Sequence, residues 1–249
     1  MIELKNIVCG YGKKNVISSL SFDIAKGKLS AVVGPNGSGK STLIKSTVGI
    51  LPLISGSITV DGVDFDTLSR KEKAKKISYL AQGKSVPEMS VLQMVLHGRF
   101  PHLNYPRCYS TKDIEIAQKA IAHMGLTDLS DKQLGELSGG TRQKAFIAMA
   151  LAQDTDYILL DEPTTYLDIS AQLELMRILR SLADTGKGVV MVMHDLSMTL
   201  SFADEILILS NGCARANGTP KDLVDQGVLK EVFGVDVVVN DYGTYSYKY

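Results

Sequence analysis

A glycine-rich stretch in the first fifth of the chain has the residue types and spacing needed to bind phosphate. Residues 34–42 read GPNGSGKST and satisfy the pattern G-x-x-x-x-G-K-[ST]. We expect a buried strand just before it, over Leu29–Val33, and the start of a helix just after it. Glycines let backbone N–H groups point inward at a phosphate, and the helix N-terminus adds its positive dipole end. The stretch therefore predicts a phosphate-binding loop formed by Gly34, Pro35, Asn36, Gly37, Ser38, Gly39, Lys40, Ser41 and Thr42.

Four side chains in and beyond this loop have the chemistry for phosphoryl transfer. Lys40 can reach the β- and γ-phosphates of a nucleotide, and the Ser41 hydroxyl can hold Mg²⁺. Residues 157–163 read YILLDEP, an apolar strand that ends in two carboxylates. Asp161 is placed to hold Mg²⁺, and Glu162 is placed to accept a proton from an attacking water. Alone this acidic pair would indicate a solvated loop, but beside a phosphate loop it predicts nucleotide hydrolysis.

A second anion-binding device lies between these motifs. Ser138, Gly139 and Gly140 precede a run that is expected to be helical over residues 142–152. Backbone N–H groups at such a helix N-terminus can meet a phosphate without a lysine. A single nucleotide site has little use for two such devices on one chain. The simplest geometry is a dimer in which residues 138–140 of each chain close on the phosphate loop of the other.

Together and in this order, the motifs resemble those of the nucleotide-binding subunit of ATP-binding cassette (ABC) transporters, over nearly the whole chain. Residues 137–143, LSGGTRQ, resemble the signature motif of that family, with Thr141 where Gln or Glu is more usual. The resemblance implies ATP and Mg²⁺ as cofactors and an ATP-driven mechanical cycle. It also implies a second copy of the chain and integral-membrane permease subunits as partners, with a substrate-binding protein acting indirectly.

The resemblance further implies roles for four residues that would carry little meaning alone. Tyr11 would stack on adenine, although by itself it could be an ordinary loop aromatic. Gln82 would sense the γ-phosphate and Mg²⁺, or else simply end a strand. Asp168 would mediate contact across the dimer, or cap a helix over residues 169–182, or both. His194 would contact the γ-phosphate, or precede a helix whose N-cap is Asp195.

Strand and helix patterns divide the chain into two lobes, and the resemblance implies one ABC ATPase domain over residues 1–249. The fold class is α/β, a P-loop NTPase (RecA-like) core with an antiparallel β edge subdomain and an inserted helical subdomain. Residues 1–85 and 154–249 would form the core and the β subdomain. Residues 86–153 would form the helical subdomain that carries the signature. Alternating residues at 2–4, 20–24 and 57–61 predict an antiparallel edge sheet next to the strand before the phosphate loop.

Two further segments resemble one subgroup of the family. Gly98-Arg99-Phe100-Pro101-His102 and residues 232–236 resemble ATPases of importers for ferric siderophores, haem and cobalamin. The alternative for the first segment is that Pro101 and His102 merely form a loop after a helix. The resemblance implies a subunit that energises uptake of a metal chelate through a separate permease, a ferric siderophore first and haem or cobalamin next. An ABC ATPase of another transporter, an exporter included, or one that acts outside transport is the alternative.

Composition agrees with such a subunit. The 249 residues carry a formal net charge of +0, so no general attraction to nucleic acid is indicated. Three widely spaced cysteines form no metal or disulfide pattern. The sequence shows no signal peptide and no apolar run of the roughly 20 residues that span a bilayer. We therefore expect a peripheral protein at the cytoplasmic face of the cell membrane, with no nucleic-acid partner.

Overall fold

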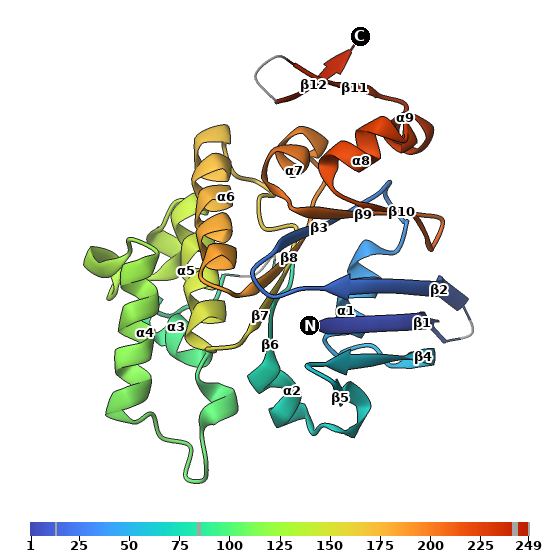
Figure 1. The fold of residues 1–249 in the computed structure, drawn as a ribbon. Helices are drawn as coiled ribbons and strands as arrows, with labels where there is room; N and C mark the ends of the chain where they lie inside the picture. Colours follow the sequence, from blue (N-terminus) through green and yellow to red (C-terminus); the bar gives the residue numbers. More distant parts are fainter. Residues whose placement is uncertain (13, 84–85, 241–243, 249) are drawn as a thin grey trace.

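The computed structural model describes residues 1–12, 14–83, 86–240 and 244–248. Its centre is a sheet in which six described strands follow the order β10-β9-β3-β8-β7-β6 (Figure 1). The strands are β3 (Leu29–Val33), β6 (Ile77–Leu80), β7 (Tyr157–Asp161), β8 (Gly188–Val192), β9 (Glu205–Ser210) and β10 (Cys213–Gly218). All neighbours are parallel except β9 and β10. The predicted boundary after residue 85 lies outside the described residues.

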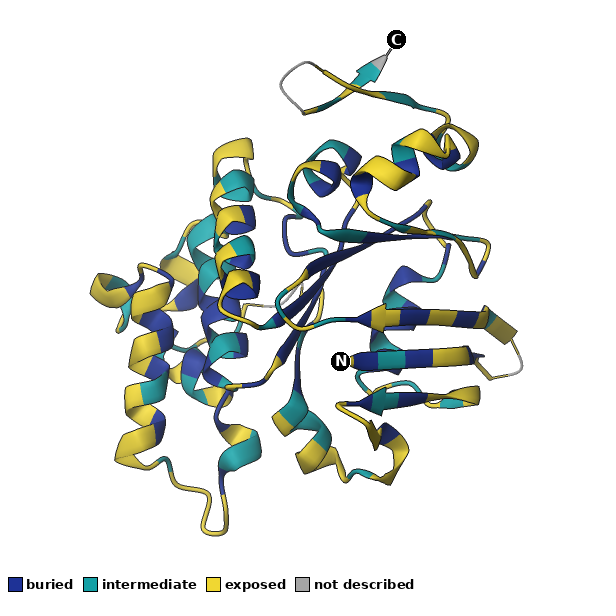
Figure 2. Ribbon diagram, in the orientation of Figure 1, coloured by how far each residue is buried: buried dark blue, intermediate teal, exposed yellow. Residues whose placement is uncertain are grey.

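The inner strands are buried on both faces. Every residue of β3, β7 and β8 is buried, and Figure 2 shows these strands dark along their length. Continuous apolar sequences such as VVMV in β8 form strands of this kind, because helices cover both faces of a parallel sheet. Their carboxyl ends meet at one edge of the sheet, and the loops that leave this edge carry the candidate site.

The predicted antiparallel strands form a sheet of their own beside the central sheet. Its order is β2-β1-β4-β5, with β1 (Ile2–Tyr11), β2 (Lys14–Ile24), β4 (Leu53–Val60) and β5 (Val63–Asp64). Helix α1 (Lys40–Thr47) packs between the two sheets, and Leu43 and Ile44 share one apolar cluster with residues of both. The phosphate loop is thereby anchored from two sides.

Three helices pack together beside the central sheet (Figure 1). They are α3 (Val91–His97), α4 (Thr111–His123) and α5 (Gly139–Ala152), with the short 3₁₀ turns η2 (Phe100–His102), η3 (Thr127–Leu129) and η4 (Leu134–Glu136). Their apolar sides join the same cluster as the central sheet. The remaining elements are η1 (Phe65–Thr67), α2 (Arg70–Lys76), α6 (Ile169–Asp184), α7 (Leu196–Phe202), α8 (Pro220–Asp225), α9 (Val228–Phe233), β11 (Asp236–Val239) and β12 (Tyr245–Lys248). None of the helices in the described ranges is long and apolar enough to cross a membrane.

The segment after α3 holds the C-terminal end of α5. Arg99 Nη1 donates to the carbonyl oxygen of Ala152 at 2.8 Å, and His102 Nε2 donates to that of Gln153 at 2.9 Å. Helix ends leave such carbonyls without partners inside the helix, and basic side chains satisfy them well. The chain passes so close that a Cβ on Gly98 would lie 2.1 Å from the Met149 oxygen. The Gly98–His102 pattern therefore has a structural explanation within the fold.

Arg99 also forms a buried ion pair, from Nε to Asp113 Oδ1 at 3.0 Å. The two side chains are only 6% and 12% exposed. Hydrogen bonds from Ser110, together with the Arg99 guanidinium, lower the pKa of Asp113 to about 2 against the opposing effect of burial. The pair therefore stays charged at neutral pH.

We expect Arg99→Ala to lower the free energy of unfolding by about 3–5 kcal/mol, because removing one partner leaves the other charge buried. Urea denaturation monitored by circular dichroism measures this change. Arg177→Ala on the exposed side of α6 is the matched control, with an expected change within about 0.5 kcal/mol. Equal stability of the two variants would show that the Arg99 contacts do not stabilise the fold.

Candidate functional site

The candidate site lies at the carboxyl edge of the central sheet. The phosphate loop follows β3, Gln82 lies two residues beyond β6, and His194 lies two residues beyond β8. Asp161 is the last residue of β7, and Glu162 follows it directly. Ligands of open α/β sheets bind outside the carboxyl ends of the strands. Parallel pairing therefore brings together residues that are far apart in the sequence.

The backbone of the phosphate loop requires its glycines. A Cβ on Gly34 would lie 2.0 Å from the Leu209 oxygen and 2.7 Å from Ser38 Oγ. Gly37 and Gly39 adopt left-handed conformations, with φ of +77° and +103°. A side chain at any of the three would collide or strain the turn. The sequence pattern and the local geometry therefore agree.

The interior of this loop has the chemistry to bind a phosphate. Lys40 is 6% exposed, and its Nζ donates to the carbonyl oxygens of Gly34 at 2.7 Å and Pro35 at 3.1 Å. Burial lowers the pKa of Lys40, while the charges of Glu162 and Asp161 act against this shift. Ser38 Oγ is buried and makes no hydrogen bond with any described residue. An ammonium group and an unsatisfied hydroxyl within one loop fit the oxygens of a nucleotide phosphate.

Asp161 connects the phosphate loop to the neighbouring strands. Its Oδ1 accepts a hydrogen bond from Ser41 Oγ at 3.2 Å, and its Oδ2 accepts one from Tyr79 Oη at 3.4 Å. Burial raises the pKa of Asp161, and the adjacent Glu162 charge adds to this increase. A hydroxyl and a poorly solvated carboxylate beside a phosphate loop are ligands that Mg²⁺ prefers. The donor set fits a magnesium ion.

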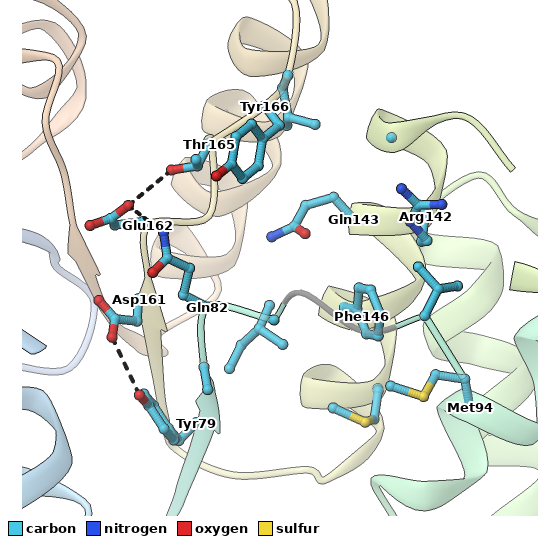
Figure 3. A pocket seen from close by; sticks show the side chains of 17 residues that line it. Tyr79, Gln82, Met94, Arg142, Gln143, Phe146, Asp161, Glu162, Thr165 and Tyr166 are labelled. Carbon is cyan, nitrogen blue, oxygen red and sulfur yellow. Dashed lines mark hydrogen bonds between the residues drawn. The ribbon is translucent and has the colours of Figure 1, made fainter. Parts of the chain in front are cut away.

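Glu162 is the centre of a second cluster (Figure 3). Its Oε1 accepts from His194 Nε2 at 2.6 Å, and its Oε2 accepts from Gln82 Nε2 at 2.7 Å and from Thr165 Oγ1 at 3.2 Å. Glu162 adopts a left-handed backbone conformation with φ of 53°, which is uncommon for a residue with a side chain. Gln82, Asp161 and Glu162 line a cavity of about 620 Å³ beside α5. The structure therefore brings Gln82, Glu162 and His194 into direct contact.

The signature residues do not reach the phosphate loop of the same chain. Ser138 caps α5, and its Oγ accepts from the Thr141 N–H at 3.2 Å. Asp168 caps α6, with Oδ1 accepting from the Ala171 N–H at 2.8 Å. Ser138, Gly139, Gly140 and Asp168 line a separate cavity of about 330 Å³. Within the described residues, no hydrogen bond joins them to the phosphate loop.

The other predicted contact residues lie around the loop in different settings. Tyr11 ends β1 and is 52% exposed, and no hydrogen bond of the described chain joins it to the phosphate loop. Pro35 and Asn36 are exposed, whereas Thr42 is buried in α1. Sequence reasoning missed Thr165 and Tyr79 as members of the two carboxylate clusters. A hydroxyl-bearing side chain near the end of the strand that precedes Gln82 is the signal that could have identified Tyr79.

Comparison with known proteins identifies the family of this chain. A family model described as "ABC transporter" matches residues 17–165. The petrobactin import ATP-binding protein FpuD of Bacillus anthracis is 39% identical over 241 residues, which are 96% of this chain and 88% of that protein. The ferric enterobactin transport ATP-binding protein FepC of Escherichia coli (strain K12) is 36% identical over 239 residues, or 95% of this chain and 88% of that protein.

A solved structure extends the similarity to the fold. It is described as an inward-facing conformation of a metal-chelate type ABC transporter, and it is 29% identical with a TM-score of 0.85. The alignment covers 100% of this chain and 97% of that chain. The α/β P-loop NTPase fold with an antiparallel β subdomain, predicted from the sequence, is confirmed. The chain belongs to the ABC transporter family, as one of its ATP-binding proteins.

Proposed function

We propose that this protein hydrolyses ATP at the carboxyl edge of its central sheet and thereby energises the import of a metal chelate, a ferric siderophore above all. The observation that supports hydrolysis is the contact of Gln82 and His194 with Glu162. The adjacent carboxylate, Asp161, accepts a hydrogen bond from Ser41 of the phosphate loop. The support for the cargo is similarity to proteins named for petrobactin import and ferric enterobactin transport. Haem and cobalamin are the next candidates.

We propose the following roles for the residues of the site. Lys40 and the N–H groups of residues 34–42 bind the β- and γ-phosphates, and Tyr11 stacks on the adenine. Ser41, Asp161 and Gln82 hold Mg²⁺, which when bound neutralises phosphate charge. Glu162 orients the attacking water and accepts its proton, and His194 contacts the γ-phosphate. Both carboxylate oxygens of Glu162 accept hydrogen bonds from side chains. The attacking water must therefore either displace one of these donors from a Glu162 oxygen or hydrogen-bond to an oxygen that already accepts from one.

Each chain supplies half of two composite sites in this proposal. Residues 138–140 and Asp168 line a cavity to which no residue of the phosphate loop of the same chain contributes. A second copy would bring its N-cap and helix dipole to that loop, where they bind a γ-phosphate. Loss of the γ-phosphate by hydrolysis then removes the bridge between the chains. The resulting opening moves permease subunits on which the protein rests, at the cytoplasmic face of the membrane.

We expect Glu162→Gln to keep ATP binding and to lower the turnover number roughly a hundredfold to ten-thousandfold, because the general base is lost. Single-turnover hydrolysis and equilibrium ATP binding separate these two effects. Glu115→Gln, an exposed substitution on α4, is the control and should hydrolyse ATP normally. Near-normal hydrolysis by Glu162→Gln would remove this residue from the role of base.

We expect mixtures of two inactive variants to regain activity if the site is shared between chains. Lys40→Ala removes the phosphate-binding ammonium, and Gly139→Glu places a carboxylate where a phosphate would bind. A side chain fits at Gly139, because the nearest atom to its Cβ would be the Tyr166 oxygen at 3.8 Å. One of the two sites in a mixed dimer contains neither substitution. Turnover of the mixture should therefore exceed that of either variant alone, and a simple average of the two would contradict the shared site.

We expect Glu162→Gln, tagged and supplied with ATP in gently solubilised native membranes, to retain a multi-helix membrane protein. Mass spectrometry of the eluate identifies it, and uptake of radiolabelled ferric siderophore by cells without that protein tests the cargo. Lys40→Ala, purified in parallel, should retain less of it. An eluate of only ribosomal or nucleic-acid-associated proteins would refute the transport proposal and leave the ATPase activity standing.

A further inference from the structure

Side chains in and just beyond strand β6 contact the two consecutive carboxylates at the end of β7, Asp161 and Glu162. Gln82, beyond the end of β6, donates to Glu162, and Tyr79 within the strand donates from Oη to Asp161 Oδ2 at 3.4 Å (Figure 3). The two strands pair in parallel with Tyr79 opposite Leu159. Asp161 lies two residues beyond Leu159 and therefore on the same face of the sheet, where the Tyr79 hydroxyl reaches its carboxylate. The role of Gln82 belongs to the proposed function, whereas that of Tyr79 does not.

The tyrosine hydroxyl acts as a donor to the carboxylate. A phenol ordinarily keeps its proton at neutral pH, and the Tyr79 Oη lies within hydrogen-bonding distance of Asp161 Oδ2. Asp161 Oδ1 accepts from Ser41 Oγ at 3.2 Å. One oxygen of the carboxylate is therefore held from the phosphate loop and the other from β6. Because each oxygen accepts a hydrogen bond from a different element, rotation of the Asp161 carboxylate about its Cβ–Cγ bond is restricted.

We propose that Tyr79 is a positioning residue that orients Asp161 to bind Mg²⁺. This inference rests on the proposed function, which assigns Asp161 to the metal. Residues that hydrogen-bond to metal ligands orient them, and their loss commonly weakens metal affinity by about 10–100-fold. A contact of 3.4 Å is long for O–H···O, so the lower end of that range is expected here.

The surroundings of the ring allow this role to be separated from packing. Tyr79 is half-buried, and among the described residues it alone lines both the cavity at Glu162 and a groove of about 450 Å³ between α1 and α2. Loss of the hydroxyl therefore leaves no sealed void. Tyr157, on the neighbouring strand and opposite Ile77, makes an equivalent bond from Oη to Asp61 Oδ1 at 2.7 Å, away from the carboxylates of the site. It is fully buried and offers a matched control.

The test compares Tyr79→Phe with Tyr157→Phe in the full-length protein. Mn²⁺ serves as the probe, and electron paramagnetic resonance measures its affinity in the presence of ADP. Tyr79→Phe should weaken Mn²⁺ binding about tenfold, raise the Mg²⁺ concentration needed for half-maximal ATP hydrolysis, and leave metal-free ADP binding unchanged. Tyr157→Phe should leave Mn²⁺ affinity unchanged and lower the melting temperature instead.

Unchanged Mn²⁺ affinity in Tyr79→Phe, with wild-type hydrolysis at limiting Mg²⁺, would overturn the role of Tyr79 and leave the proposed ATPase intact. Equal losses of Mn²⁺ affinity in both tyrosine variants would also overturn it, since a general loss of stability would then explain them. A wild-type protein that hydrolyses no ATP with Mg²⁺ would refute the proposed function itself. Melting temperatures measured on every variant show whether a loss of metal binding comes from unfolding.

Discussion

Parallel pairing of β3, β8, β7 and β6 is the constraint on which the rest of this structure depends. It brings the carboxyl ends of four strands to one edge of the sheet. The phosphate loop that begins at Gly34, the amide of Gln82, the carboxylates of Asp161 and Glu162 and the imidazole of His194 therefore lie together. The pairing is stable because the strands are buried on both faces. Helix α1 packs between the two sheets and thereby fixes the position of the phosphate loop from which it begins.

The two carboxylates at the end of β7 differ because their surroundings differ. Asp161 is buried, receives two hydroxyls, and has a raised pKa. Glu162 adopts a left-handed conformation and is less deeply buried, and an amide, a hydroxyl and an imidazole reach it. Consecutive residues thus obtain one environment suited to a metal ion and another suited to proton transfer. The backbone turn at Glu162 separates the two.

Helix α5 connects the signature residues at its N-terminus to strand β6 near its C-terminal end. Its first turn carries Ser138 as N-cap, and its last carbonyls are held by Arg99 and His102. The side chain of Gln153, just past the helix, donates to the carbonyl oxygens of Ala74 in α2 and of Ile77, the first residue of β6. A continuous set of hydrogen bonds therefore runs from the end of α5 to the strand that supplies Tyr79 and Gln82. The Gly98–His102 pattern, which the sequence associates with one class of importer, is part of this connection.

The sequence by itself determined the features whose geometry is local. The phosphate loop, the cap at Asp168 and the buried strand Leu29–Val33 follow from glycine conformations, short polar side chains and apolar runs within a few residues. The order of motifs predicted the family and its fold. Only the tertiary structure decided that Arg99 pairs with Asp113 and that Tyr79 reaches Asp161. These contacts join residues on different elements, and the register of paired strands and the packing between elements set such distances, which no local pattern encodes.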